Sequence, residues 1–155
     1  MSETPITTPV ADAGVRFTVR RARSATAWHT VPDYAVAHAF AASTNTLSVD
    51  WLRPVLHPDV VLTSEWAGVR HCGRRVVLLW MWTRYQAPKL SRHGYRSQLV
   101  VMPDGRAGVL TRLTRTGETV LTSFVVAGGL IEAIHVTPRF DRAKLVETGV
   151  CPPEH

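Results

Sequence analysis

The most informative stretch of this chain is residues 56–68, which read Leu56-His57-Pro58-Asp59-Val60-Val61-Leu62-Thr63-Ser64-Glu65-Trp66-Ala67-Gly68. Its apolar residues predict a strand from Val60 to Trp66, followed by a turn at Trp66-Ala67-Gly68. Glu65 lies near the end of this strand. A carboxylate on an otherwise apolar strand is costly to bury, so it must be paired, exposed or functional. Glu65 is therefore the first candidate site residue.

Two helical segments are predicted before this strand. Val31-Pro32-Asp33 predicts a helix start, and apolar residues continue at helical spacing until Ser43-Thr44-Asn45-Thr46 breaks the pattern. Ser48 then predicts the cap of a second helix, which Pro54 must keep short or kinked.

The two ends of the chain have a different character from the middle. Residues 1–12 are rich in Thr, Pro and Ala, which predicts a disordered tail. Residues 13–30 predict an arm, because Val15, Phe17 and Val19 alternate with polar residues as in an edge strand. A domain over 31–140 and a C-terminal tail over 141–155 complete the expected organisation.

After the turn at Gly68, a short strand is predicted over Val69 to Cys72 and a helix from Gly73 to Ala87, ended by Pro88. The apolar run Val76 to Trp82 could also form a buried strand, but its length and flanking arginines favour the helix.

Four further strands follow at regular spacing, separated by turn residues, which is the pattern of an antiparallel meander. Helices first and a meander second indicate an α+β fold, in which helices cover one face of a curved, mostly antiparallel sheet. The four predicted strands are Tyr95 to Met102, Ala107 to Arg115, Glu118 to Val126 and Leu130 to Thr137.

Composition limits the classes of function. The apolar fraction is 45% and the net charge is +6, with two cysteines in 155 residues. These values predict one ordinary globular domain without a disulfide framework or a zinc cluster. The longest apolar run, Val76 to Trp82, is far shorter than the roughly 20 residues that span a membrane, and the polar N-terminus predicts a cytoplasmic location. The basic residues are spread along the chain apart from a cluster at Arg16, Arg20, Arg21 and Arg23, so nucleic acid is not expected as the main partner.

The order of these elements resembles the NTF2-like superfamily, in particular its SnoaL-like and ketosteroid isomerase-like cones. The resemblance covers residues 32–138 and rests on four features: Trp51-Leu52, Leu56-x-x-Asp59-Val60, Gly73, and Gly129-Leu130-Ile131-Glu132-Ala133-Ile134. It implies about three N-terminal helices on a curved sheet and a homodimer packed through the outer sheet face.

In ketosteroid isomerase-like proteins the first strand ends in an acidic residue that acts as general base, and the matching position here is Glu65. The resemblance also implies two oxyanion donors, but their positions fall near Ala41 and Leu121, so these donors do not transfer. Glu65 could instead form a salt bridge with an arginine such as Arg70 or Arg112.

Several residues are candidates for a ligand pocket beside Glu65. Trp66, Trp80 and Met81 would shape an apolar pocket, together with Tyr34. Ser123 shares a strand face with Leu121 and would donate a hydrogen bond, although it could also bond locally to the backbone, as could Thr111. His135 is assigned to the outer sheet face as an interface residue.

These features predict an enzyme that isomerises, cyclises or dehydrates a small apolar metabolite by acid/base chemistry, without metal or cofactor, in keeping with secondary metabolism. The alternative is a non-catalytic module that binds a ligand or supports a partner. A third hypothesis is a basic protein that binds nucleic acid through Arg16 to Arg23.

Overall fold

The computed structural model describes residues 25–91 and 94–153. The chain divides into two compact units, residues 1–30 and 31–155. In the first unit the described part is a 3₁₀ helix, η2, over Ala25–Thr30. The predicted tail over 1–12 and the predicted strand around Phe17 lie outside the described residues.

The second unit begins with helix α2, Tyr34–Thr46, whose buried side packs against strands of the sheet. The sequence predicts that this helix stops at Ser43, but it continues to Thr46. Ser43, Thr44 and Asn45 can remain helical because they are buried and hydrogen-bonded inside the domain. Leu47, at a positive φ of 56°, ends it.

The predicted second helix is replaced by two 3₁₀ turns, η3 (Val49–Trp51) and η4 (Arg53–Val55). Ser48 caps the first turn as expected, accepting a hydrogen bond from the backbone N–H of Asp50. Pro54 cannot donate a backbone hydrogen bond, which agrees with the absence of a continuous α-helix here. The expectation of three N-terminal helices is therefore not met in this described segment.

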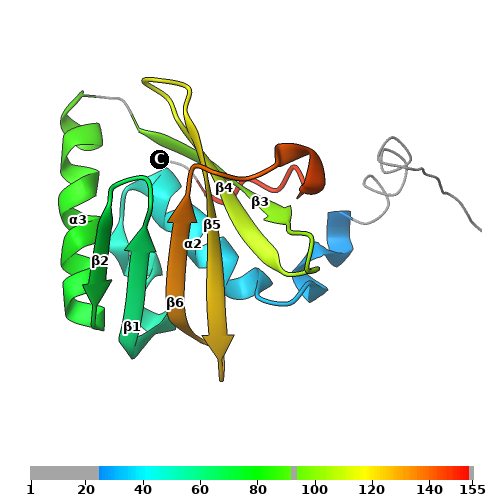
Figure 1. Cartoon of the computed structure of the whole chain (residues 1–155), viewed down its shortest axis with the longest axis horizontal. Helices are drawn as coiled ribbons and strands as arrows, with labels where there is room; N and C mark the ends of the chain where they lie inside the picture. Colours follow the sequence, from blue (N-terminus) through cyan, green and yellow to red (C-terminus); the bar gives the residue numbers. More distant parts are fainter. Residues whose placement is uncertain (1–24, 92–93, 154–155) are drawn as a thin grey trace, which may run out of the picture. The chain divides into compact units, whose positions relative to one another are not determined.

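Seven strands form one mixed, curved sheet in the order β2-β1-β6-β5-β4-β3-β7 (Figure 1). All neighbouring strands are antiparallel except β1 and β6, which are parallel. The strands are β1 (Leu56–Ser64), β2 (Val69–Cys72), β3 (Tyr95–Val101), β4 (Ala107–Leu113), β5 (Thr119–Ala127), β6 (Leu130–Thr137) and β7 (Val146–Glu147).

Helix α3, Arg74–Ser91, lies alongside β1 and β2 and contacts both (Figure 1). It runs through Pro88 to Ser91 instead of ending at Ala87. Its buried side carries Val77, Leu78, Met81 and Tyr85, at helical spacing, and these join the core between the helices and the sheet.

Residues 141–155 are not simply a tail, since part of this segment pairs with the edge of the sheet. Strand β7 is antiparallel to β3, and the Leu99 N–H donates to the carbonyl of Val150 at 3.0 Å. The Thr148 hydroxyl donates to the Leu99 carbonyl at 2.7 Å. The segment covers the otherwise open edge of β3.

Alternation along the strands decides which side chains face the helices. Val60, Leu62 and Ser64 of β1 are buried on the inner face, so Glu65, the next residue, does not share that face. On β5 the buried inner residues are Val120, Thr122 and Phe124. The prediction that Ser123 faces the inside of the cone is therefore wrong.

Candidate functional site

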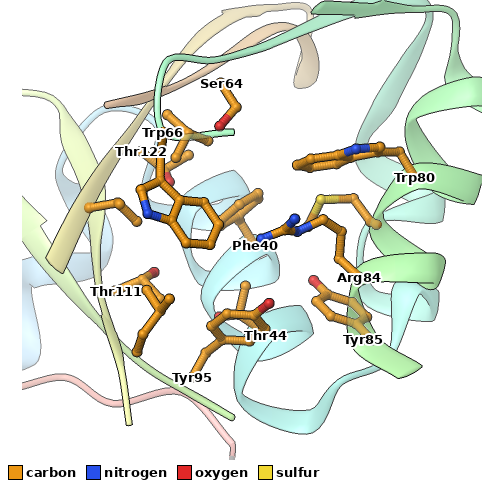
Figure 2. A pocket seen from close by; sticks show the side chains of 14 residues that line it. Phe40, Thr44, Ser64, Trp66, Trp80, Arg84, Tyr85, Tyr95, Thr111 and Thr122 are labelled. Carbon is orange, nitrogen blue, oxygen red and sulfur yellow. The ribbon is translucent and has the colours of Figure 1, made fainter. Parts of the chain in front are cut away.

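A cavity of about 60 Å³ lies between α2, α3 and the inner face of the sheet (Figure 2). Its walls come from all of these elements and from the turn after β1. Most of the lining is apolar or aromatic, with hydroxyl groups and one arginine among it. The lining residues are Phe40, Thr44, Ser64, Trp66, Trp80, Met81, Arg84, Tyr85, Tyr95, Thr111, Leu113, Val120, Thr122 and Val136.

Three of the predicted ligand-binding residues line this cavity: Trp66, Trp80 and Met81. Trp66 reaches it from the turn after β1, and the other two from the inner side of α3. Thr111, a weaker candidate, also lines it. The structure thus brings the predicted apolar pocket residues together.

Glu65 does not line the cavity, so the inward orientation predicted for it is wrong. Its carboxylate lies 2.7 Å from Nε2 of His135 and 3.2 Å from the guanidinium of Arg139. The Thr137 hydroxyl donates a hydrogen bond to it at 3.1 Å. It is paired, as the salt-bridge alternative predicted, although its partner is Arg139 and not Arg70 or Arg112.

These contacts affect the titration of Glu65. Its pKa is lowered, first by the hydrogen bond from Thr137 and then by Arg139 and the nearby His135, while partial desolvation opposes the shift. A general base near neutral pH needs the opposite change, a raised carboxyl pKa.

Tyr34 and Ser123 also lie away from the cavity. The Tyr34 ring contacts His38, with a centroid distance of 6.0 Å, and packs against the edge of the core. Ser123 pairs with His135 across β5 and β6 on the opposite sheet face. From the same two elements, Phe40 on α2 and Thr122 on β5 line the cavity instead.

Arg84 is the charged group of the cavity. Its guanidinium lies over two indole rings, 4.7 Å from the centroid of Trp66 and 5.1 Å from that of Trp80. Figure 2 shows its side chain reaching from α3 across the pocket. No described residue forms a salt bridge with Arg84, which is partly buried, and the described groups that stabilise its positive charge are the electron-rich faces of the rings.

Most hydroxyl groups in the lining already bond to the protein. Tyr85 and Ser43 share a buried hydrogen bond of 2.8 Å. The Ser97 hydroxyl hydrogen-bonds to the hydroxyls of both Thr44 and Thr111, and it lies 2.8 Å from that of Thr111. The Ser64 hydroxyl accepts a hydrogen bond from the N–H of Ala67, with a donor–acceptor distance of 3.0 Å.

The hydroxyl of Thr122 is different, because it makes no hydrogen bond with another described residue, and the same holds for the hydroxyl of Tyr95. Burial raises the pKa of the Tyr85 phenol, and the hydrogen bond to Ser43 only partly opposes this. The described cavity wall therefore offers neutral donors and one cation.

His71 lies beside the site. Its ring contacts that of Trp80, with centroids 5.4 Å apart, and its Nε2 atom is buried without a hydrogen-bond partner among the described residues. The histidine is not part of the cavity wall. It contacts the cavity wall through Trp80, which does line it.

The sequence reasoning missed Phe40, Ser64, Arg84, Tyr85 and Tyr95. Helical spacing was a usable signal for two of them, because Arg84 and Tyr85 follow Trp80 and Met81 by four residues and so share their side of α3. Ser64 could have been found from the alternation of Val60 and Leu62. Tyr95 sits at the start of β3, where no pattern distinguishes it.

Among the described residues, no group of three or more His, Cys, Asp or Glu side chains is arranged to hold a metal ion. In the same part of the chain, no helix combines the length and apolar character that a membrane crossing requires.

No protein-family model matches the sequence, and no curated protein matches it significantly. A candidate ketosteroid isomerase from Kribbella flavida DSM 17836 is similar in structure, with 18% identity, a TM-score of 0.49, and coverage of 66% of this chain and 74% of that one. A candidate polyketide cyclase from Sinorhizobium meliloti has 25% identity and a TM-score of 0.46, covering 63% and 89%.

An LEH-like epoxide hydrolase from M. tuberculosis has 20% identity and a TM-score of 0.44, covering 73% of this chain and 84% of that one. These TM-scores are all below 0.5, so the likeness says nothing about the activity of this chain. A protein with a ketosteroid isomerase-like fold from Catenulispora acidiphila DSM 44928 and an NTF-2 like protein from Burkholderia xenovorans LB400 are also similar in structure, with TM-scores of 0.44 and 0.42.

Proposed function

We propose that this protein binds a small, largely apolar organic molecule in the cavity between α2, α3 and the inner sheet face. The observation that carries the proposal is the wall itself, in which Phe40, Trp66, Trp80 and Met81 surround a hollow that also contains the unbonded hydroxyl of Thr122. Apolar walls with a few convergent polar groups are typical of small-molecule sites.

Ligand binding is favoured over acid/base turnover by the chemistry of the wall. Proton abstraction needs a base within hydrogen-bond reach of the substrate. Among the described lining residues there is no carboxylate, imidazole or thiol. Glu65, the predicted base, is held by Arg139, Thr137 and His135 outside the cavity.

The test uses a filled cavity and a matched control. Thr122→Leu adds bulk to the wall without removing a described hydrogen bond, whereas Ser123→Leu makes a similar change on the other face of β5. Neutral probes such as toluene, benzyl alcohol and benzamide should shift the indole N–H signals of Trp66 and Trp80 in NMR titrations. T122L should weaken binding at least roughly fivefold, while S123L should not. Equal binding by both variants, or no binding to the wild type, would contradict the proposal.

The second candidate is the cofactor-free enzyme predicted from the sequence, with Glu65 as its acid or base. The observation that favours it is the 2.7 Å contact between Glu65 and His135, which places two proton-transfer groups together. Incorporation of deuterium from solvent into 3-cyclohexenone, followed by NMR, tests it. Wild-type exchange faster than in buffer alone, lost in Glu65→Gln, would support catalysis by Glu65. Wild-type exchange at the buffer rate would contradict the enzyme hypothesis.

A further inference from the structure

We propose that Arg84 is an anion-binding residue and that the ligand of the cavity is a small aromatic carboxylate. This inference rests on the proposed function and specifies its ligand. Its starting point is the position of a cation in a largely apolar wall, where Arg84 lies between Trp66 and Trp80.

Charge balance is the first argument. A partly buried arginine is normally paired with a carboxylate, because a charge removed from water loses much of its hydration. Within the described part of the chain Arg84 has no such partner, and none of the described aspartates or glutamates lines the cavity. Cation–π contacts with two indoles offset only part of this cost. A ligand that brings one negative charge would supply the missing partner.

The shape of the groups gives the second argument. The planar guanidinium forms two parallel hydrogen bonds with a carboxylate, and this geometry fits better than a single charge contact. Arg84 is the only cation in the described wall, so a singly charged anion is favoured over a doubly charged phosphate.

We infer that the ligand is aromatic because the Arg84 guanidinium occupies space beside two indole rings that an aromatic ring could fill. The cavity of about 60 Å³ is smaller than the roughly 150 Å³ that holds a benzene ring in an apolar core. The guanidinium, however, takes up space over the faces of Trp66 and Trp80. If the flexible Arg84 side chain moves aside, an aromatic ring can stack on these indoles in its place. The displaced guanidinium then hydrogen-bonds to the carboxylate of the ligand. The indoles thus exchange one stacking partner, the guanidinium, for another, the aromatic ring of the ligand.

Thr122 completes the site. Thr122 lines the cavity from β5 and its hydroxyl has no described hydrogen-bond partner, so it can bind a hydroxyl or carbonyl group on the ring. Most other wall hydroxyls are already used within the protein. The polar recognition of the ligand is therefore assigned chiefly to Arg84 and secondarily to Thr122.

Benzoate and benzamide test the inference because they have nearly the same size and differ in charge. Isothermal titration should show the wild type binding benzoate roughly tenfold or more tightly than benzamide, as expected for a charge-assisted hydrogen bond. Arg84→Gln should remove this preference while leaving the affinity for benzamide within about threefold, and Arg84→Lys should retain part of the preference. Thermal unfolding shows whether each variant is folded.

Arg75→Gln is the control. Arg75 is an exposed arginine on the same helix that does not line the cavity, so this variant makes the same change in net charge. It should keep the benzoate preference. Loss of the preference in R75Q, its persistence in R84Q, or its absence in the wild type would overturn the role of Arg84. Equal binding of benzoate and benzamide would overturn this inference and leave the proposed function standing, whereas failure of all the neutral probes would overturn the proposed function itself.

Discussion

The carboxylate of Glu65 lies 2.7 Å from Nε2 of His135, and this contact joins the end of β1 to the neighbouring parallel strand β6. Thr137 and Arg139 bind the same carboxylate from the end of β6 and the residues that follow. The acid that the sequence predicts as a catalytic base is thus part of a polar cluster that links two strands, outside the cavity.

This cluster makes the free energy of unfolding depend on pH in the acidic range. Because the pKa of Glu65 is lowered from 4.5 in the folded protein, its contribution is fully present above that value and is lost as the pH falls through the lower folded-state pKa. Wild type should therefore lose more stability between pH 7 and pH 3 than Glu65→Gln does. Urea unfolding at both pH values measures the difference.

Thr137→Val provides a graded comparison, because its hydroxyl makes the largest contribution to the lowered pKa of Glu65. It should show an acid sensitivity between those of the wild type and E65Q. An equal loss of stability on acidification in the wild type and E65Q would show that the cluster does not stabilise the folded state.

The buried pair of Tyr85 and Ser43 should behave as a unit. Tyr85→Phe leaves the Ser43 hydroxyl without its 2.8 Å partner, so it should cost about 1 kcal/mol of unfolding free energy. Ser43→Ala should cost a similar amount.

The double variant S43A/Y85F tests the coupling, because it removes both hydroxyls and leaves neither unpaired. Its cost should be smaller than the sum of the two single costs by about 0.5–1.5 kcal/mol in denaturant unfolding. Strict additivity would mean that the two hydroxyls do not stabilise each other.

The sequence predicts some elements well because turn residues mark their ends. β2 is found as Val69–Cys72 and β6 as Leu130–Thr137, the predicted bounds, and each follows a glycine at positive φ, Gly68 or Gly129. The polar run at Ser43 was misleading, since hydroxyl and amide groups are compatible with a buried helix when partners from other elements satisfy them. Those partners, Tyr85 and Ser97, are far away in the sequence.

The predicted site differs from the observed one by a single position at the end of β1, where Ser64 and not Glu65 lines the cavity. The alternation of Val60 and Leu62 places Ser64 inside, whereas the family resemblance predicts an inward acid at Glu65. On β5 both alternating sets mix apolar and hydroxyl residues, so the face of Ser123 could not be chosen by pattern. The place of Arg84 between two indoles cannot be predicted from local sequence, because it depends on a contact between the turn after β1 and α3.

Asn45 should be among the most important polar residues for stability. It accepts from the Ser97 N–H at 2.7 Å and donates to the carbonyls of Ser97 and Pro152, so it ties α2 to β3 and to the C-terminal segment. Asn45→Ala leaves these backbone groups unpaired and should cost about 1–3 kcal/mol.

The neighbouring Thr46→Ala is the control, because the Thr46 hydroxyl bonds only to the Ala42 carbonyl within the same helix. T46A should be less destabilising in urea unfolding than N45A. N45A should also make the segment after Thr148 easier to remove by limited proteolysis. A fully stable and protease-resistant N45A would show that strand β7 and the apolar contacts of Val150 hold the segment without the amide.

The family resemblance implies a dimer, and two exposed apolar surfaces of this chain could form its interface. Val125 on the outer face of the sheet is 57% exposed, and Leu79 on the outer side of α3 is 64% exposed, close to Val76 and Trp82. If the protein dimerises through the outer sheet face, Val125→Arg should place a charge in the interface and shift the protein toward monomers, whereas Leu79→Arg should leave the dimer intact. Light scattering across a concentration series measures the shift. Dissociation by L79R alone would assign the interface to α3, and a wild type that remains monomeric at high concentration would contradict both arrangements.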